Sequence, residues 1–148
     1  MKNAKMSNRE FYLRNFTWGL PVNLGGAVLA LVALATGHKP KKFGQCVQFN
    51  VGKNWGGGSL GVFMFTGSET SDELKAHEHG HGIQNAYYGP LMPFVVNVPS
   101  SARFWFRKIR GKLNPQTKMK PYDSAWFEAE ATKLGMERCF PYKKKNHQ

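Results

Sequence analysis

The most hydrophobic part of the chain lies near its N-terminus. Residues 18–37 form an uncharged run of about 20 positions, enough for a helix that crosses a bilayer. Aromatic residues precede this run and lysines follow it, a distribution typical of segments that enter membranes. A proline, an asparagine and two adjacent glycines dilute the signal, so a buried helix of the protein core is the alternative. We therefore expect an apolar, membrane-associated helix at 17–37, preceded by a basic segment at 1–16.

Two shorter segments have the composition of β-strands. Residues 46–51 and 59–65 are rich in valine and phenylalanine, and glycines dominate the segment 52–58 between them. This pattern predicts a glycine-rich hairpin in a small antiparallel sheet. Together with the helices described next, it indicates an α+β fold.

A helix is predicted to follow the strands. It starts at a capping box, with Thr70 as N-cap and Glu73 three residues later, and its periodic pattern runs until Gly89–Pro90. Gly80 and Gly82 weaken this helix by about 1 kcal/mol each relative to alanine. That cost suggests that another part of the chain packs closely there.

Beyond this helix the chain is both apolar and basic. Prolines interrupt residues 87–99, so we expect a loop there, followed by a short amphipathic helix whose arginines and lysines reach anionic lipid. Packing of the same aromatic residues beneath the functional site is the alternative.

The overall charge is strongly positive. The 148 residues include 21 Lys and Arg against 9 Asp and Glu, a net charge of +12, in a length that fits one domain. Nucleic-acid binding would use the stretch 103–120 and the basic tail 141–148, but no nucleic-acid motif accompanies them. Because the basic clusters flank apolar segments, attraction to a membrane surface explains them with fewer assumptions. The two cysteines, Cys46 and Cys139, are expected to be free, buried thiols, with a single bridge as the alternative.

The clearest chemical signal is the spacing H-E-x-x-H at His77, Glu78 and His81. On a helix this spacing places two imidazoles one turn apart on one face, as zinc ligands require, with a carboxylate beside them. Hydrolysis needs a base near the water that the metal activates, and Glu78 could supply it. Gln84, one turn further on, is a candidate to hold a histidine in place. His79 points away from this face, so we expect it to be exposed.

A second helix near the C-terminus could supply a third ligand. Residues 122–135 have a helical pattern, with Asp123 or Ser124 as the expected N-cap. Glu128 and Thr132 share one face of this helix, so Glu128 could bind the metal while Thr132 holds a histidine.

The remaining acidic residues support this assignment. Glu130 points about 160–200° away from Glu128 by the helical period, so we expect a surface charge. All nine acidic residues except Glu10 fall in 69–78 or 123–137, the two segments proposed to surround the cation.

With these residues the chain resembles the zincins of the gluzincin type, and more closely a group of small bacterial H-E-x-G-H proteins. In that group the motif continues through segments seen here as Gly82–Asn85, Gly89–Phe94, Val98–Ser100 and Trp126–Glu128. The resemblance implies a minimal zincin-like domain at 38–140, with His77, His81 and Glu128 as Zn²⁺ ligands and Glu78 as the base. Thr132 departs from the aspartate that many gluzincins have at this position.

The resemblance also implies a reaction. A zincin hydrolyses a peptide bond in a peptide or protein substrate, which commonly adds as a strand to the sheet edge beside the metal. Here the glycine-rich hairpin or Leu60–Phe65 would bind the substrate, and Tyr87, Tyr88 or Tyr122 would act as a transition-state donor. Two alternatives remain: a non-catalytic zinc-binding protein, and a basic protein that binds membranes or nucleic acids.

Overall fold

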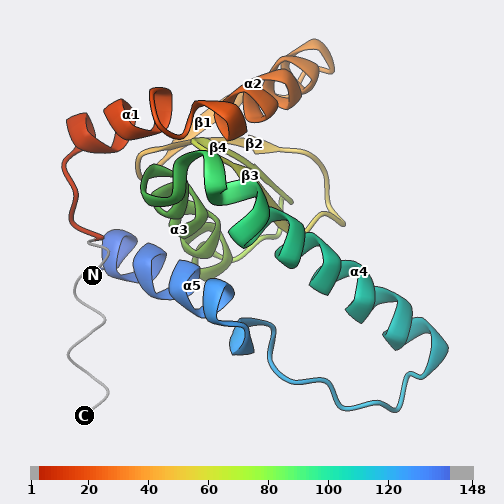
Figure 1. Ribbon diagram of the computed structural model, residues 1–148. Helices are drawn as coiled ribbons and strands as arrows, with labels where there is room; N and C mark the ends of the chain where they lie inside the picture. The colour runs from red at the N-terminus through yellow and green to blue at the C-terminus, as the bar shows by residue number, and fades with distance from the viewer. Residues whose placement is uncertain (1–3, 141–148) are drawn as a thin grey trace.

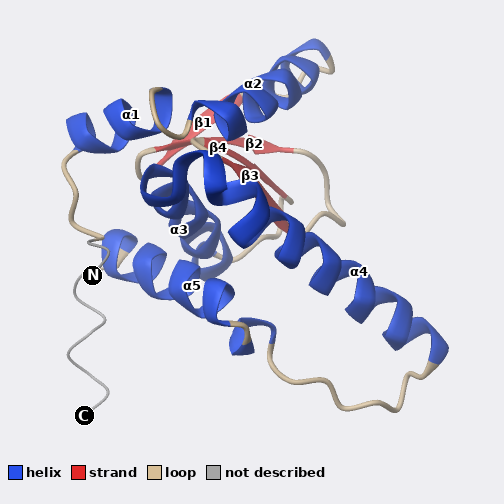
Figure 2. Ribbon diagram, viewed as in Figure 1, coloured by secondary structure: helices blue, strands red, loops and turns tan. Residues whose placement is uncertain are grey.

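The computed structural model describes residues 4–140 as an α+β fold (Figure 1, Figure 2). The predicted fold class is thus confirmed at this level, while the basic tail 141–148 lies outside the described residues. The helices are α1 (Asn8–Phe16), α2 (Leu20–Ala35), α3 (Asp72–Tyr88), α4 (Val98–Leu113) and α5 (Trp126–Cys139). The strands are β1 (Pro40–Phe43), β2 (Cys46–Asn50), β3 (Gly57–Leu60) and β4 (Phe63–Thr66).

The sheet has the strand order β1-β2-β4-β3 and is mixed. β1 and β2 are antiparallel, as are β3 and β4, whereas β2 and β4 are parallel, with Val47 opposite Phe63. The predicted hairpin between 46–51 and 59–65 was therefore wrong. Gly61, at φ +64°, reverses the chain within the second segment, so this segment forms two strands instead of one. As a result β3 lies at an edge of the sheet.

α3 is the central helix of the fold, and every residue from Ala76 to Ala86 is buried. Its N-cap is Ser71, whose hydroxyl accepts the Leu74 N–H, so the predicted N-cap, Thr70, was wrong by one residue. The Thr70 hydroxyl instead donates to the Gly56 carbonyl and fixes the loop before the helix. As predicted, the helix ends at Gly89, which has a positive φ.

α5 packs closely along α3 (Figure 1). A Cβ atom on Gly80 would overlap the backbone of Ala131, and one on Gly135 would overlap the backbone of Ala76. This contact confirms the close packing predicted from the glycines of α3. The predicted cap of α5 was wrong, because residues Tyr122–Ser124 form a separate 3₁₀ turn and Ala125 occupies the N-cap position without a side-chain hydrogen bond.

The N-terminal helices belong to the same core as the rest of the chain. Phe11 of α1 is fully buried in one cluster with Cys46 and Ile83, and Ala30 of α2 packs with Phe49 of the sheet. Within residues 4–140, no single helix is both long and apolar enough to cross a membrane. α1 and α2 reach that length only together, and they are bent by 90° where they meet.

Residues 89–113 are helical at almost every position, in contrast to the predicted loop. A 3₁₀ turn (Gly89–Leu91) and a π-helical turn (Pro93–Asn97) lead directly into α4. Each of the three elements has a proline at its first or second position. Backbone N–H groups in the first turn of a helix have no acceptor within that helix, so a proline there costs no hydrogen bond. α4 carries the arginines and lysines that were expected on the predicted amphipathic helix, and it extends away from the body of the protein (Figure 1).

Candidate metal centre

Three side chains from α3 and α5 meet in a buried site. His77 and His81 lie one turn apart on α3, and Glu128 enters from the first turn of α5. One potential ligand atom from each residue lies within 4.8 Å of the others. The structure thus brings together the three residues that the sequence suggested as metal ligands.

The ring nitrogens of both histidines have defined partners. His77 Nδ1 lies 2.8 Å from the Thr132 hydroxyl, and His81 Nδ1 lies 2.8 Å from Gln84 Oε1. The two Nε2 atoms lie 3.1 and 3.3 Å from the same oxygen, Glu128 Oε2. Thr132 and Gln84 therefore occupy the supporting positions expected of them, and both Nε2 atoms face the carboxylate.

The hydrogen-bond network determines the tautomer of His81. The Gln84 amide nitrogen donates to the Phe127 carbonyl and to Glu130 Oε2, so its oxygen must face His81. An amide oxygen only accepts, hence His81 Nδ1 carries the hydrogen. In the neutral ring Nε2 then directs a lone pair at a carboxylate, and this repulsion is relieved by a proton on Nε2 or by a metal cation between the two atoms.

Glu128 is the residue most in need of such a cation. Its side chain is fully buried, and Oε1 accepts a hydrogen bond from Ser100, whereas Oε2 has no partner with hydrogen-bond geometry. Burial alone would raise the pKa of Glu128, but the two imidazoles and the Ser100 hydroxyl outweigh it and hold the pKa well below its usual range. The buried carboxylate is therefore ionised, with one oxygen free to bind a metal.

The same cluster raises the pKa of His81. Burial lowers the pKa of this ring, but the nearby carboxylates of Glu128 and Glu78 more than compensate. The site thus attracts a positive charge, either a proton or a metal ion.

Glu130 is not the surface charge that the helical period predicted. Its carboxylate is partly buried and accepts hydrogen bonds from Gln84 Nε2 at 2.8 Å and from the Tyr88 hydroxyl at 3.0 Å. The residue does point away from Glu128, but α3 covers that side of α5 as well. Through Gln84 it helps to fix the orientation of His81.

The Glu78 side chain projects from α3 toward β3, the edge strand of the sheet. Its Oε2 accepts a hydrogen bond of 2.9 Å from the Ser59 hydroxyl of β3. A Cβ atom on Gly57 would lie 2.7 Å from Oε1, so a larger residue there would displace the carboxylate from its present position. The proposed base is therefore positioned by the strand to which an extended peptide could add.

The three candidate tyrosines occupy different places. The Tyr122 hydroxyl lies 3.4 Å from Ser100 Oγ, next to Glu128, and burial together with the nearby carboxylates raises its pKa. The Tyr88 hydroxyl is bonded to Glu130, and Tyr87 packs against the core and the Arg14 guanidinium. Of the three, Tyr122 lies nearest the ligand atoms by these contacts.

His79 is fully buried, so the predicted exposure was wrong. Its Nε2 accepts the Gln45 N–H at 3.1 Å, and its ring stacks on Phe11. Burial, with a smaller contribution from Arg138, lowers the pKa of His79 to about 4, so the ring is neutral near pH 7. This histidine joins the β1–β2 turn to α3 and lies outside the metal site.

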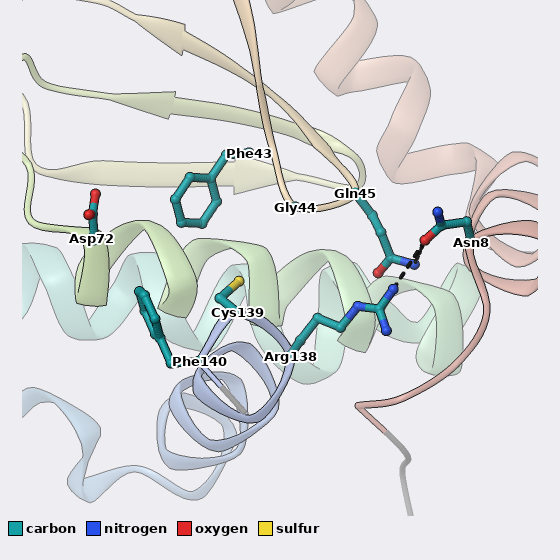
Figure 3. Close-up of a pocket in the computed structure, with 8 residues that line it drawn as sticks. All are labelled: Asn8, Phe43, Gly44, Gln45, Asp72, Arg138, Cys139 and Phe140. Atoms are coloured by element: carbon teal, nitrogen blue, oxygen red, sulfur yellow. Dashed lines mark hydrogen bonds between the residues drawn. The ribbon is translucent and has the colours of Figure 1, made fainter. Parts of the chain in front are cut away.

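One cavity lies away from the candidate ligands. It has a volume of about 450 Å³ and lies between the start of α1, the β1–β2 turn and the end of α5 (Figure 3). At its rim Asn8 Oδ1 accepts hydrogen bonds from Gln45 and Arg138. Cys139 lines it as well, and both cysteines are free thiols, as expected, although only Cys46 is fully buried.

Nothing in the sequence indicated that Ser59 contacts Glu78, that Ser100 contacts Glu128, or that Glu130 supports Gln84. Ser100 falls in a segment that the resemblance covers, but nothing about a single serine or glutamate predicts its distant partner. No protein-family profile, no curated protein sequence and no solved structure matches this chain. The geometry of the site is therefore the basis on which its function is inferred.

Proposed function

We propose that the protein is a zinc-dependent hydrolase of peptide bonds with a zincin-like site. The proposal is carried by one observation: two imidazole nitrogens and an unbonded carboxylate oxygen converge in a buried site. Two nitrogens and one oxygen are a common ligand set for catalytic zinc, which keeps a further position open for water or substrate.

The surrounding residues suit hydrolysis better than a purely structural site. A structural zinc site is closed by four protein ligands, whereas only three candidate ligands meet among the described residues. Glu78 adds a carboxylate beside them, which such a site would not need. Along the chain the edge strand β3 comes first, the H-E-x-x-H helix α3 second and the glutamate helix α5 last. This is the order expected from the resemblance to gluzincins.

Each residue then has a defined task. When bound, the zinc ion would polarise a carbonyl group and lower the pKa of water. Glu78, held by Ser59, accepts a proton from the attacking water and delivers it to the leaving amine. Tyr122 would donate a hydrogen bond to the developing oxyanion. The free edge of β3 can pair with an extended substrate strand.

Metal analysis of the purified protein tests the site. Wild-type protein should bind zinc in a one-to-one ratio, and His77→Ala or Glu128→Gln should lose it. His38→Ala is the matched control, since His38 lies outside the site and its ring is hydrogen-bonded to Thr36 and Ala33 at the end of α2. Wild-type protein that binds no zinc or other transition metal would exclude the proposed site.

Catalysis requires a separate test. Glu78→Gln preserves the shape of the side chain and should leave zinc bound, while hydrolysis of a mixed peptide library falls at least about 10²-fold. Zinc binding without any hydrolysis by the wild type would identify a non-catalytic zinc protein. Equal hydrolysis by the variant would assign the activity to another group.

A further inference from the structure

α4 has a continuous apolar stripe that faces solvent. Val98, Trp105, Ile109 and Leu113 recur at helical spacing, so their side chains share one side of the helix. Each of the four is 54–81% exposed, and no residue of α4 is buried. Among the described residues nothing covers this side of the helix, because α4 extends away from the body of the protein (Figure 1).

The other side of α4 faces the protein. Arg103 donates hydrogen bonds to the Pro121 and Tyr122 carbonyls and to Ser124, and Arg107 donates to the Lys120 carbonyl. By the helical period these arginines lie about 120–180° from the centre of the apolar stripe. The polar side of α4 therefore holds the chain that returns to α5, and this contact leaves the stripe pointing outward.

The charge around the stripe has one sign. From Val98 to Tyr122 the chain has seven arginines and lysines and no acidic residue. Lys108 Nζ lies 5.0 Å from the centre of the Trp105 ring, and the Arg110 guanidinium lies 5.8 Å from that of Phe106. Aromatic rings bordered by cations are typical of helices that lie in the interface of an anionic membrane.

We propose that α4 binds in the plane of an anionic lipid bilayer, with its apolar stripe inserted among the acyl chains. A second copy of the protein would bring these seven cations close to their own duplicates, and nucleic acid would leave the apolar stripe exposed to water. An anionic membrane satisfies both features of the helix at once.

This orientation would also place the metal centre close to the membrane. Ser100, in the first turn of α4, donates to Glu128 from the side of the helix that faces the protein. The stripe lies on the opposite side, so the site would sit about one helix diameter, roughly 10 Å, above the bound surface. Lipid binding itself requires neither metal nor catalysis, and hence it can be tested independently of the proposed reaction.

The test is sedimentation of the full chain with vesicles of phosphatidylcholine, with and without phosphatidylglycerol. Ile109→Glu places a charge in the stripe, whereas Phe104→Glu places the same charge on another side of the same helix. The two positions are similarly exposed, at 54% and 48%. We expect the wild type to bind the anionic vesicles, Ile109→Glu to lose at least about tenfold in affinity, and Phe104→Glu to lose clearly less. Unchanged thermal unfolding of both variants would show that they remain folded.

Three results would overturn the proposal. Equal losses in the two variants would show that the stripe does not enter the lipid. Equal binding to neutral vesicles would exclude the role of the cations. Absence of vesicle binding, with either self-association through the stripe or salt-sensitive binding to a DNA duplex, would assign α4 to a different partner.

Discussion

Replacing Asn23 by leucine tests whether the N-terminal helices are part of the folded domain. The Asn23 amide is buried and donates to the Asn15 carbonyl at 2.6 Å, while its oxygen accepts the Val62 N–H at 2.8 Å. It thereby joins the end of α1 and the start of α2 to the β3–β4 turn. Its oxygen fits there because Gly61 has no side chain.

The expected loss can be worked out from these bonds. Leucine has a similar volume but leaves two buried groups, the Val62 N–H and the Asn15 carbonyl, without the partner that Asn23 provided. Each such group costs about 1–3 kcal/mol, so we expect the free energy of unfolding to fall by about 2–6 kcal/mol. A typical domain has only about 5–15 kcal/mol in total, so the loss would be a large share.

Urea unfolding followed by circular dichroism, with chelator present, measures this loss. The control is Leu24→Gln, because the neighbouring Leu24 is 58% exposed and its replacement should change stability by no more than about 0.5 kcal/mol. A loss below about 1 kcal/mol for Asn23→Leu, or one no larger than in the control, would refute the anchoring of α2 in the core. The same contacts imply that deleting residues 1–37 would open the core, so such a deletion is unsuitable as a test of membrane binding.

Three further predictions follow from other contacts. Gly80→Ala should destabilise the protein by about 1–3 kcal/mol in the same assay, because α5 leaves no room for a methyl group. Gly111→Ala in α4 should be neutral or stabilise by up to about 1 kcal/mol, because a Cβ atom there would meet only the end of the Met119 side chain, at an ordinary contact distance of 3.7 Å. Equal effects of the two substitutions would contradict the packing. Thr132→Val should weaken zinc binding about 10–100-fold in a chelator competition, because His77 Nδ1 loses its partner; unchanged affinity would show that the hydroxyl does not support the ligand. Burial raises the pKa of Cys139 to about 11, so the reactive thiolate forms only as the pH rises toward that value. Alkylation at pH 8, followed by mass spectrometry, should therefore be at least about tenfold slower in the folded than in the unfolded protein, and equal rates would contradict the raised pKa.

The sequence predicts the elements that carry local signals. The spacing of His77 and His81, the glycines of α3 and the stop at Gly89 are each explained by neighbours within a few residues or by a close helix contact. The same reasoning placed Glu128 and Thr132 on one face of a second helix, and that face meets the histidines. These inferences held because helical periodicity relates residues that are near in the chain.

Other features depended on distant contacts and were missed. Nothing local shows that Gly61 turns the chain back so that β2 and β4 become parallel. His79 and Glu130 were expected at the surface because the helical period points them away from the metal ligands. Their partners, Gln45 and Gln84, come from other elements, and a buried polar residue cannot be recognised from sequence until its partner is known. The prolines near residue 93 indicated a loop, although the first turn of a helix accepts them equally well.

The contact between α3 and α5 also bears on the order in which protein and metal come together. In zinc fingers the chain folds only when the ion arrives. Here the two ligand-bearing helices meet through their backbones at Gly80 and Gly135, and Leu134 and Ile83 share a buried cluster, neither of which needs an ion. The three candidate ligands are thus brought together by the fold itself. If zinc binds as proposed, its uptake would be a binding step on a folded protein, in contrast to a zinc finger.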